Sequence, residues 1–102
     1  MQEIPFTPSN YQKLFKDKRS TIRLGERSYY KGEVLLTCRS LELSFISTIR
    51  EVEITTFGKL DDIHAAMEGF SNLSELKEEL RLLYRTEITS ADTVTIAYFG
   101  ES

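Results

Sequence analysis

Residues 18–24 read Lys-Arg-Ser-Thr-Ile-Arg-Leu, and the interpretation of the rest of the chain starts from this stretch. Apolar Ile22 and Leu24 alternate with polar Thr21 and Arg23, which predicts a short strand. Because strand side chains alternate between two faces, we expect the apolar pair to face the core. The opposite face would then carry one hydroxyl and two guanidinium groups, those of Arg19, Thr21 and Arg23.

The segment before this strand predicts a short strand and a helix. Ile4 and Phe6 fit a first strand, and Thr7 is a suitable N-cap for a helix with Pro8 at its first position. Apolar residues then recur at helical spacing and predict one buried helix face, made of Tyr11, Leu14 and Phe15.

The segment after it predicts two more strands. Gly25 and Gly32 bound a loop that leads into a strand over residues 34–38. A longer strand covers residues 43–57. Its alternation changes phase between residues 49 and 52, as expected of a β-bulge or a strong bend.

The last third of the chain predicts two helices and a final strand. A helix over residues 60–68 would be ended by Gly69, a favoured C′ residue. Asn72 and Glu75 fit a capping box for a second helix, which ends near Tyr84. Residues 93–99 alternate as a strand does. The predicted class is therefore α+β.

Composition indicates one globular domain over residues 1–102. Of these residues, 40% are hydrophobic and 28% charged. No apolar run is long enough for a membrane helix, and the acidic, proline-containing N-terminus does not fit a signal peptide. Cys38, the single cysteine, permits no internal disulfide, which predicts a cytoplasmic location. One cysteine and one histidine (His64) are too few for a structural zinc site, so we expect no metal and no cofactor.

Charge is unevenly distributed along the chain, whose net charge is −3. Residues 10–39 hold eight basic and three acidic side chains, whereas residues 40–102 hold five basic and twelve acidic ones. An acidic protein is a poor general nucleic-acid coat, because affinity for phosphate grows with the number of phosphates neutralised. The basic cluster is still compatible with one anionic or electron-rich ligand.

Several motifs together resemble the ASCH family, a PUA-like class, and within it the small bacterial N4-acetylcytidine amidohydrolases. The first motif is a lysine, two residues, a threonine, one residue and an arginine, at residues 18–23. An aromatic residue and Gly-Glu-Val follow at 30–34, and His-Ala-Ala-Met-Glu follows at 64–68. Leu73, Leu76, Tyr84 and the strand at 93–99 complete the order, so the resemblance covers nearly the whole chain.

The resemblance implies a small mixed β-barrel with flanking helices and a cleft for a base or nucleoside. It further implies Lys18 as proton acceptor, Thr21 as nucleophile and Glu68 as proton donor. The first motif departs from the family pattern at Lys16, Arg19 and Leu24, and these departures bear on the substrate.

The chemistry of the three residues is consistent with these roles. A threonine hydroxyl needs a base, and a lysine serves as one when burial or nearby cations lower its pKa. Lys16, Arg19 and Arg23 would supply such cations. Glu68 is predicted at a helix C-terminus, where the helix dipole disfavours an ionised carboxylate.

Four residues are candidates for binding substrate. Arg23 could stabilise the oxyanion that forms on amide attack. Arg19 would add positive charge, and Tyr29 and Tyr30 would either stack on a base or pack in the barrel core.

Each candidate also has an ordinary structural interpretation: Lys18 and Arg19 as exposed charges, Thr21 as a β-branched strand residue, Glu68 as a solvated helix end. Only their joint spacing favours a site.

Two functions fit such a site. One is hydrolysis of an N4-acylated cytidine nucleoside, and the other is an RNA-binding or ribonucleolytic module. The sequence leaves the acyl group and the oligomeric state open.

Overall fold

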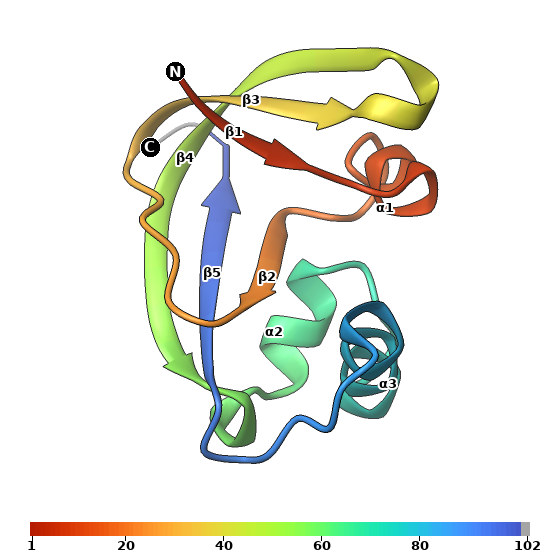
Figure 1. The fold of residues 1–102 in the computed structure, drawn as a ribbon, viewed down its shortest axis with the longest axis vertical. Coiled ribbons are helices and arrows are strands. Elements are labelled where there is room, and N and C mark those ends of the chain that lie inside the picture. The colour runs from red at the N-terminus through yellow and green to blue at the C-terminus, as the bar shows by residue number, and fades with distance from the viewer. Residues whose placement is uncertain (101–102) are drawn as a thin grey trace.

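The computed structural model describes residues 1–100 and has an α+β architecture (Figure 1). Its elements, in chain order, are β1 (Gln2–Pro5), α1 (Pro8–Lys13), β2 (Ser20–Leu24), β3 (Gly32–Cys38), β4 (Leu43–Thr56), α2 (Asp62–Met67), α3 (Leu73–Tyr84) and β5 (Thr93–Phe99). Short 3-10 turns follow β3 and β4. Within the described residues, no helix is long and apolar enough to cross a membrane.

The five strands form one mixed sheet in the order β1-β3-β4-β5-β2. β1 and β3 run parallel, and the other neighbouring pairs are antiparallel. The sheet curls into a half-barrel with the three helices along its flanks (Figure 1). The predicted α+β class, a mixed barrel-like sheet with flanking helices, is confirmed.

The long strand β4 bends where the sequence predicted a bulge. Its pairing with β5 shifts register between Ile49 and Glu51, which pair with Phe99 and Tyr98. A bulge adds one residue to one strand and increases the local twist. The 14-residue strand can therefore arc across the sheet and pair with β3 at one end and β5 at the other (Figure 1).

The two edge strands, β1 and β2, approach each other across the open side of the half-barrel. Arg23 on β2 donates a hydrogen bond from Nη2 to the carbonyl oxygen of Pro5, at the end of β1, over 2.6 Å. The same guanidinium lies over the ring of Phe6, 4.9 Å from its centroid. Arg23, on the face of β2 that was expected to be basic, therefore joins the two edge strands.

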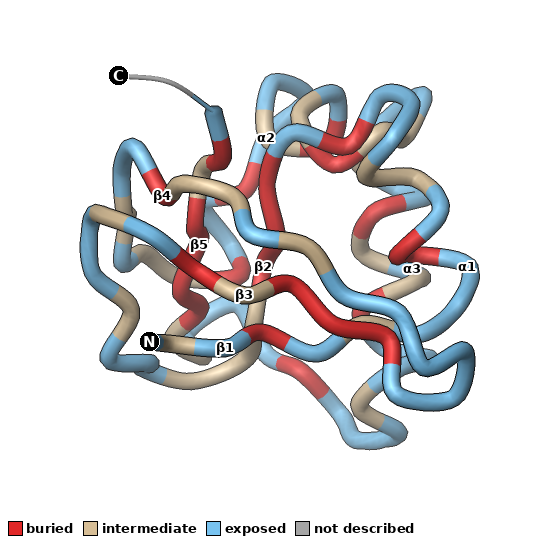
Figure 2. The backbone as a smooth tube through the Cα atoms, turned by 90° about the horizontal axis from the view of Figure 1, so that it is seen from above, coloured by how far each residue is buried: buried red, intermediate tan, exposed pale blue. Residues whose placement is uncertain are grey.

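Two apolar clusters hold the sheet and helices together. One contains Ile22, Leu76 and Ile96 and lies between the sheet and helices α2 and α3. The other contains Ile4 and Leu36, from β1 and β3. Figure 2 shows the buried stretches running along β2, β3 and β5.

The helix starts follow the predicted caps. The Thr7 hydroxyl accepts the backbone N–H of Asn10 at the start of α1, and the Asn72 side chain accepts that of Glu75 at the start of α3. The second half of a capping box, Glu75 reaching back to Asn72, is absent from the hydrogen bonds of the described residues.

Two expectations about the helices were wrong. α2 covers Asp62–Met67, not 60–68, because the Asp61 carboxylate caps its first N–H groups and leaves Leu60 buried before the helix. Phe15 is exposed, because α1 ends at Lys13 and the following turn carries Phe15 away from the core. Its ring instead contacts that of Phe45.

Candidate active site

Lys18 and Glu68, 50 residues apart in the chain, form a buried pair. Lys18 Nζ contacts Glu68 Oε2 as a hydrogen bond and an ion pair, and the two residues are only 6% and 3% exposed. The backbone holds them together, since the N–H of Arg19 donates to the carbonyl of Met67 over 2.6 Å. The residue after Lys18 is thereby bonded to the residue before Glu68.

Burial moves the pKa values of the two groups towards each other. It lowers the pKa of the Lys18 amino group and raises that of the Glu68 carboxyl, because both lose the water that stabilises their charged forms. Their mutual attraction opposes both shifts. Arg23 and Lys13 lower the pKa of Lys18 further through charge repulsion. The uncharged forms of the pair, amine and carboxylic acid, are therefore favoured relative to the same groups in water.

The causes of these shifts differ in part from those expected from the sequence. Burial, rather than a cluster of cations, is the largest cause for Lys18, and neither Lys16 nor Arg19 is among its causes. Burial also dominates for Glu68, which is the C-cap of the six-residue helix α2. The expected directions were right, and of the three expected cations only Arg23 lowers the pKa of Lys18.

The Thr21 hydroxyl is held by its neighbour on the same strand face. Thr21 is 3% exposed, and its Oγ1 accepts a hydrogen bond of 3.0 Å from Arg23 Nε. Arg23 is fixed in turn by its bond to Pro5 and its contact with the Phe6 ring. As acceptor for Arg23, the hydroxyl keeps its own proton available for a base or a ligand.

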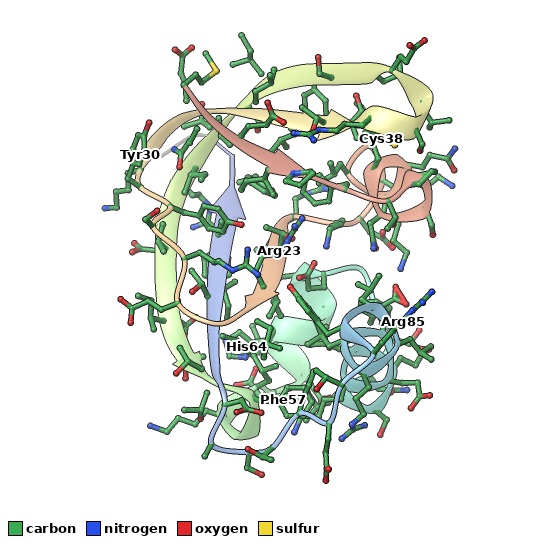
Figure 3. The ribbon with its side chains drawn as sticks, viewed as in Figure 1. Arg23, Tyr30, Cys38, Phe57, His64 and Arg85 are labelled. Carbon is green, nitrogen blue, oxygen red and sulfur yellow. The ribbon has the colours of Figure 1, made fainter. Side chains whose placement is uncertain are left out.

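These groups line one pocket of about 210 Å³. Its walls come from the end of β1, from α1, from β2, from the C-terminal end of α2 and from α3. Four of the predicted site residues are in its lining: Lys18, Thr21, Arg23 and Glu68. Figure 3 shows Arg23 beside β2, facing the region between β1 and α2.

Three predicted substrate-binding residues lie outside this pocket. Arg19 is exposed and donates to the carbonyl of Lys16 over 2.9 Å. Tyr29 packs against the apolar cluster of β1 and β3. Tyr30 is 55% exposed at the outer edge of the loop between β2 and β3 (Figure 3). Strand alternation placed Arg19 with Thr21, but Arg19 precedes β2 and its side chain turns back along the preceding turn.

Several pocket residues were not predicted as site residues, among them Phe6, Asn10, Phe70, Glu79 and Tyr84. The sequence pattern assigned Phe6 to a strand and Tyr84 to the buried stripe of a helix. No sequence pattern indicated Asn10 or Glu79. They reach the pocket only because α1 and α3 pack beside it. Among residues 1–100, no group of three or more His, Cys, Asp or Glu side chains is arranged to hold a metal ion.

Comparison with solved structures gives the fold a name. The chain is similar to the crystal structure of an ASCH domain from Lactobacillus crispatus JV V101, with a TM-score of 0.74 and 18% identity over 96% of this chain and 77% of that one. A protein of Enterococcus faecalis V583 under the family model DUF984 is also similar, with a TM-score of 0.67 and 13% identity over 94% of this chain and 68% of that one. No protein-family model and no curated protein matches. The fold is therefore the PUA-like fold of ASCH domains.

Proposed function

We propose that this protein hydrolyses the exocyclic amide of N4-acylated cytidine nucleosides. The observation that carries the proposal is the buried contact between Lys18 and Glu68 in the pocket that also contains the Thr21 hydroxyl. A base, an acid and a hydroxyl with its own proton available are the groups that amide hydrolysis requires.

The first half of the reaction acylates Thr21. Lys18, as the neutral amine, takes the proton of the Thr21 hydroxyl while Oγ1 attacks the acyl carbon. Arg23 stabilises the anion that forms on the carbonyl oxygen, since its guanidinium lies beside Oγ1 and has N–H groups that Thr21 and Pro5 do not engage. Glu68 donates its proton to the departing nitrogen, and cytidine leaves. The pair has then become ammonium and carboxylate.

The second half returns the pair to its starting state. The Glu68 carboxylate takes a proton from water as the water attacks the acyl-threonine ester, and the Lys18 ammonium returns a proton to Oγ1 as the ester bond breaks. A carboxylic acid leaves. Ammonium–carboxylate and amine–acid carry the same number of protons, so water is the only co-reactant.

The charges around the pocket favour an uncharged nucleoside over RNA. Among the residues that line the pocket, Lys18 and Arg23 are basic and Glu68 and Glu79 are acidic, so the lining has no excess of positive charge for a phosphate. Glu79 lines the pocket and also a neighbouring depression on α3, together with Glu75. A phosphate would meet these carboxylates. The volume, roughly that of seven water molecules, suits a one-ring base with a short acyl group.

RNA binding is the second candidate function, and exposed cations beside the site favour it. Lys16 and Arg19 are exposed on either side of Lys18, between α1 and β2. Binding through such side chains would weaken steeply as salt rises, because it releases counterions from phosphate. Turnover of an uncharged nucleoside would change little.

The test is the rate of N4-acetylcytidine hydrolysis by two variants of adjacent residues on β2. Thr21→Ala removes the proposed nucleophile, and we expect a loss of several powers of ten in kcat/KM. Ser20→Ala is the matched control. It removes a buried hydroxyl whose oxygen has no hydrogen-bond partner, so it should keep both fold and activity.

Near wild-type turnover by a folded Thr21→Ala variant would exclude threonine as the nucleophile. Equal losses in both variants would indicate damage to β2 rather than to the chemistry. Melting curves of the two variants separate these outcomes from unfolding.

A further inference from the structure

Asn10 is a buried polar residue that the mechanism above does not use. It lies on α1, lines the pocket and is 9% exposed. We propose that Asn10 selects substrates whose scissile amide nitrogen carries a hydrogen. This inference rests on the proposed function and names a specificity-determining residue for it.

The hydrogen bonds of Asn10 set the direction of its side chain. The Thr7 hydroxyl oxygen accepts both the backbone N–H of Asn10, over 3.4 Å, and the side-chain Nδ2, over 3.2 Å. These two bonds turn Nδ2 towards Thr7 and Oδ1 away from it. No hydrogen bond within residues 1–100 involves Oδ1. The fully buried side-chain atoms without a partner are the hydroxyl oxygens of Ser20 and Thr37, so Oδ1 is accessible. Asn10 lines the pocket, so this oxygen is the Asn10 atom left to bond a ligand there.

An unpaired acceptor in a largely buried site favours a ligand that brings a donor, since leaving a polar group without a partner destabilises the complex. The base of an N4-acylated cytidine has one hydrogen-bond donor, the N–H of the amide that is cleaved. Its ring nitrogen and carbonyl oxygens are acceptors. Asn10 Oδ1 therefore accepts from the scissile N–H and orients the amide towards Thr21.

A second pocket residue complements this arrangement. The Tyr84 hydroxyl accepts the backbone N–H of Leu24 over 2.9 Å, so its own hydrogen is available to an acceptor. A base with one donor and several acceptors matches one free amide oxygen and one free hydroxyl hydrogen. Lys18 and Glu68 are engaged with each other, so the neutral pair of Asn10 and Tyr84 is left to hold the base.

The experiment compares two substrates and three proteins. N4-acetyl-N4-methylcytidine differs from N4-acetylcytidine by a methyl group in place of the amide hydrogen. The measured quantity is the preference, the ratio of kcat/KM for the two compounds, or of inhibition constants where the methylated compound is not hydrolysed. Asn10→Leu keeps the size of the side chain and removes the acceptor. Gln12→Leu, on the exposed side of the same helix, is the control.

We expect the wild-type preference for the N–H substrate to fall by about tenfold to a hundredfold in Asn10→Leu and to be kept in Gln12→Leu. Steric effects of the methyl group act in all three proteins and largely cancel in the comparison. Asn10→Ala replaces Asn10→Leu should the latter melt below the assay temperature.

An unchanged preference in folded Asn10 variants would overturn the assignment of Asn10 while leaving the amidohydrolase proposal intact. Absence of N4-acetylcytidine hydrolysis by the wild-type protein would overturn both.

Discussion

Lys18 and Glu68 occupy a part of the molecule where charge is poorly stabilised. Both side chains are nearly inaccessible to water, and removal of two charges from water is offset only in part by their attraction. An apolar pair of similar size would pack here without that penalty. We therefore infer that the pair serves the proposed chemistry rather than the stability of the fold.

The first prediction concerns stability. Lys18→Met combined with Glu68→Leu should leave the free energy of unfolding unchanged or raise it by about 1–4 kcal/mol. Lys18→Met alone should destabilise relative to the double variant, because it leaves a buried carboxyl without its partner. Urea unfolding monitored by circular dichroism measures both. A double variant clearly less stable than wild type would mean that the pair supports the fold.

The pH dependence of that difference follows from the pKa directions. The raised pKa of Glu68 makes the folded protein bind more protons than the unfolded chain above the ordinary value near 4.5, so this contribution to stability increases as pH falls. The lowered pKa of Lys18 makes the folded protein bind fewer protons below 10.5, so its contribution increases as pH rises. The advantage of the double variant should be largest near neutral pH and shrink on both sides.

The second prediction concerns the pH dependence of activity. The active pair holds one proton more than the fully deprotonated pair, so kcat/KM should fall when the pair gains a proton or loses one. Lys13→Gln removes a cation that lowers the pKa of Lys18, and both limbs of the bell-shaped profile should move to higher pH. Arg19→Gln should leave them in place. The reverse pattern, measured at low salt, would contradict the assignment of charges around Lys18.

For single residues, the order of motifs in the sequence was sufficient to select Lys18, Thr21 and Glu68, which line one pocket. Their chemical roles stay predictions. The sequence was insufficient for the causes of the pKa shifts. Burial depends on which elements pack over a side chain, and Lys18 resembles any exposed lysine after a helix until α2 is placed against it. Charge spacing along the chain therefore overstated Arg19 and missed Lys13.

Among the elements, the end of α2 is fixed against the turn before β2 by three successive residue pairs. Arg19 bonds to Met67, Lys18 contacts Glu68, and Asp17 packs against Gly69. Gly69 has a φ of +84°, and a Cβ at this position would lie 2.6 Å from Asp17 Oδ1. The positive φ favours glycine here, and a Cβ would also force the exposed Asp17 carboxylate to turn aside.

The third prediction compares alanine substitutions at two glycines, Gly69 and Gly25. Gly69→Ala and Gly25→Ala both place alanine at a positive φ and should each lower stability by about 1–2 kcal/mol. Gly69 directly follows Glu68, so relief of the strained φ in Gly69→Ala should displace that carboxyl, whereas Gly25 follows Leu24, which has no reacting group. Its kcat should fall by about tenfold to a hundredfold, because small misplacements of reacting groups slow catalysis strongly. Equal kcat values in the two variants would contradict a positioning role for Gly69.

The elements themselves were mostly predictable, since caps, glycines and alternation act locally. Thr7, Asn72 and the bulge after Ile49 are where the sequence placed them. The exceptions were helix ends. The helical pattern of apolar residues continues through Phe15, although α1 ends at Lys13. It also includes Leu60, although Asp61 is the N-cap of α2 and Leu60 therefore precedes the helix.

Across the whole molecule, the site depends on the curl of the sheet. β1 and β2 are opposite edges of the strand order, yet Arg23 bonds to Pro5 because the bulged β4 turns the sheet back on itself. Asn10, Glu79 and Tyr84 reach the pocket only through the packing of α1 and α3 across this seam. No local pattern encodes such contacts, which explains why sequence reasoning missed them.

The proposed activity of this pocket is hydrolysis of an acylated cytidine. The most direct measurement is incubation of the purified protein with N4-acetylcytidine at neutral pH, followed by chromatography of cytidine and acetate. We expect equal amounts of both products, at a rate nearly independent of salt. No cytidine above the uncatalysed background, together with salt-sensitive binding of an RNA oligonucleotide, would contradict it and favour the RNA-binding alternative.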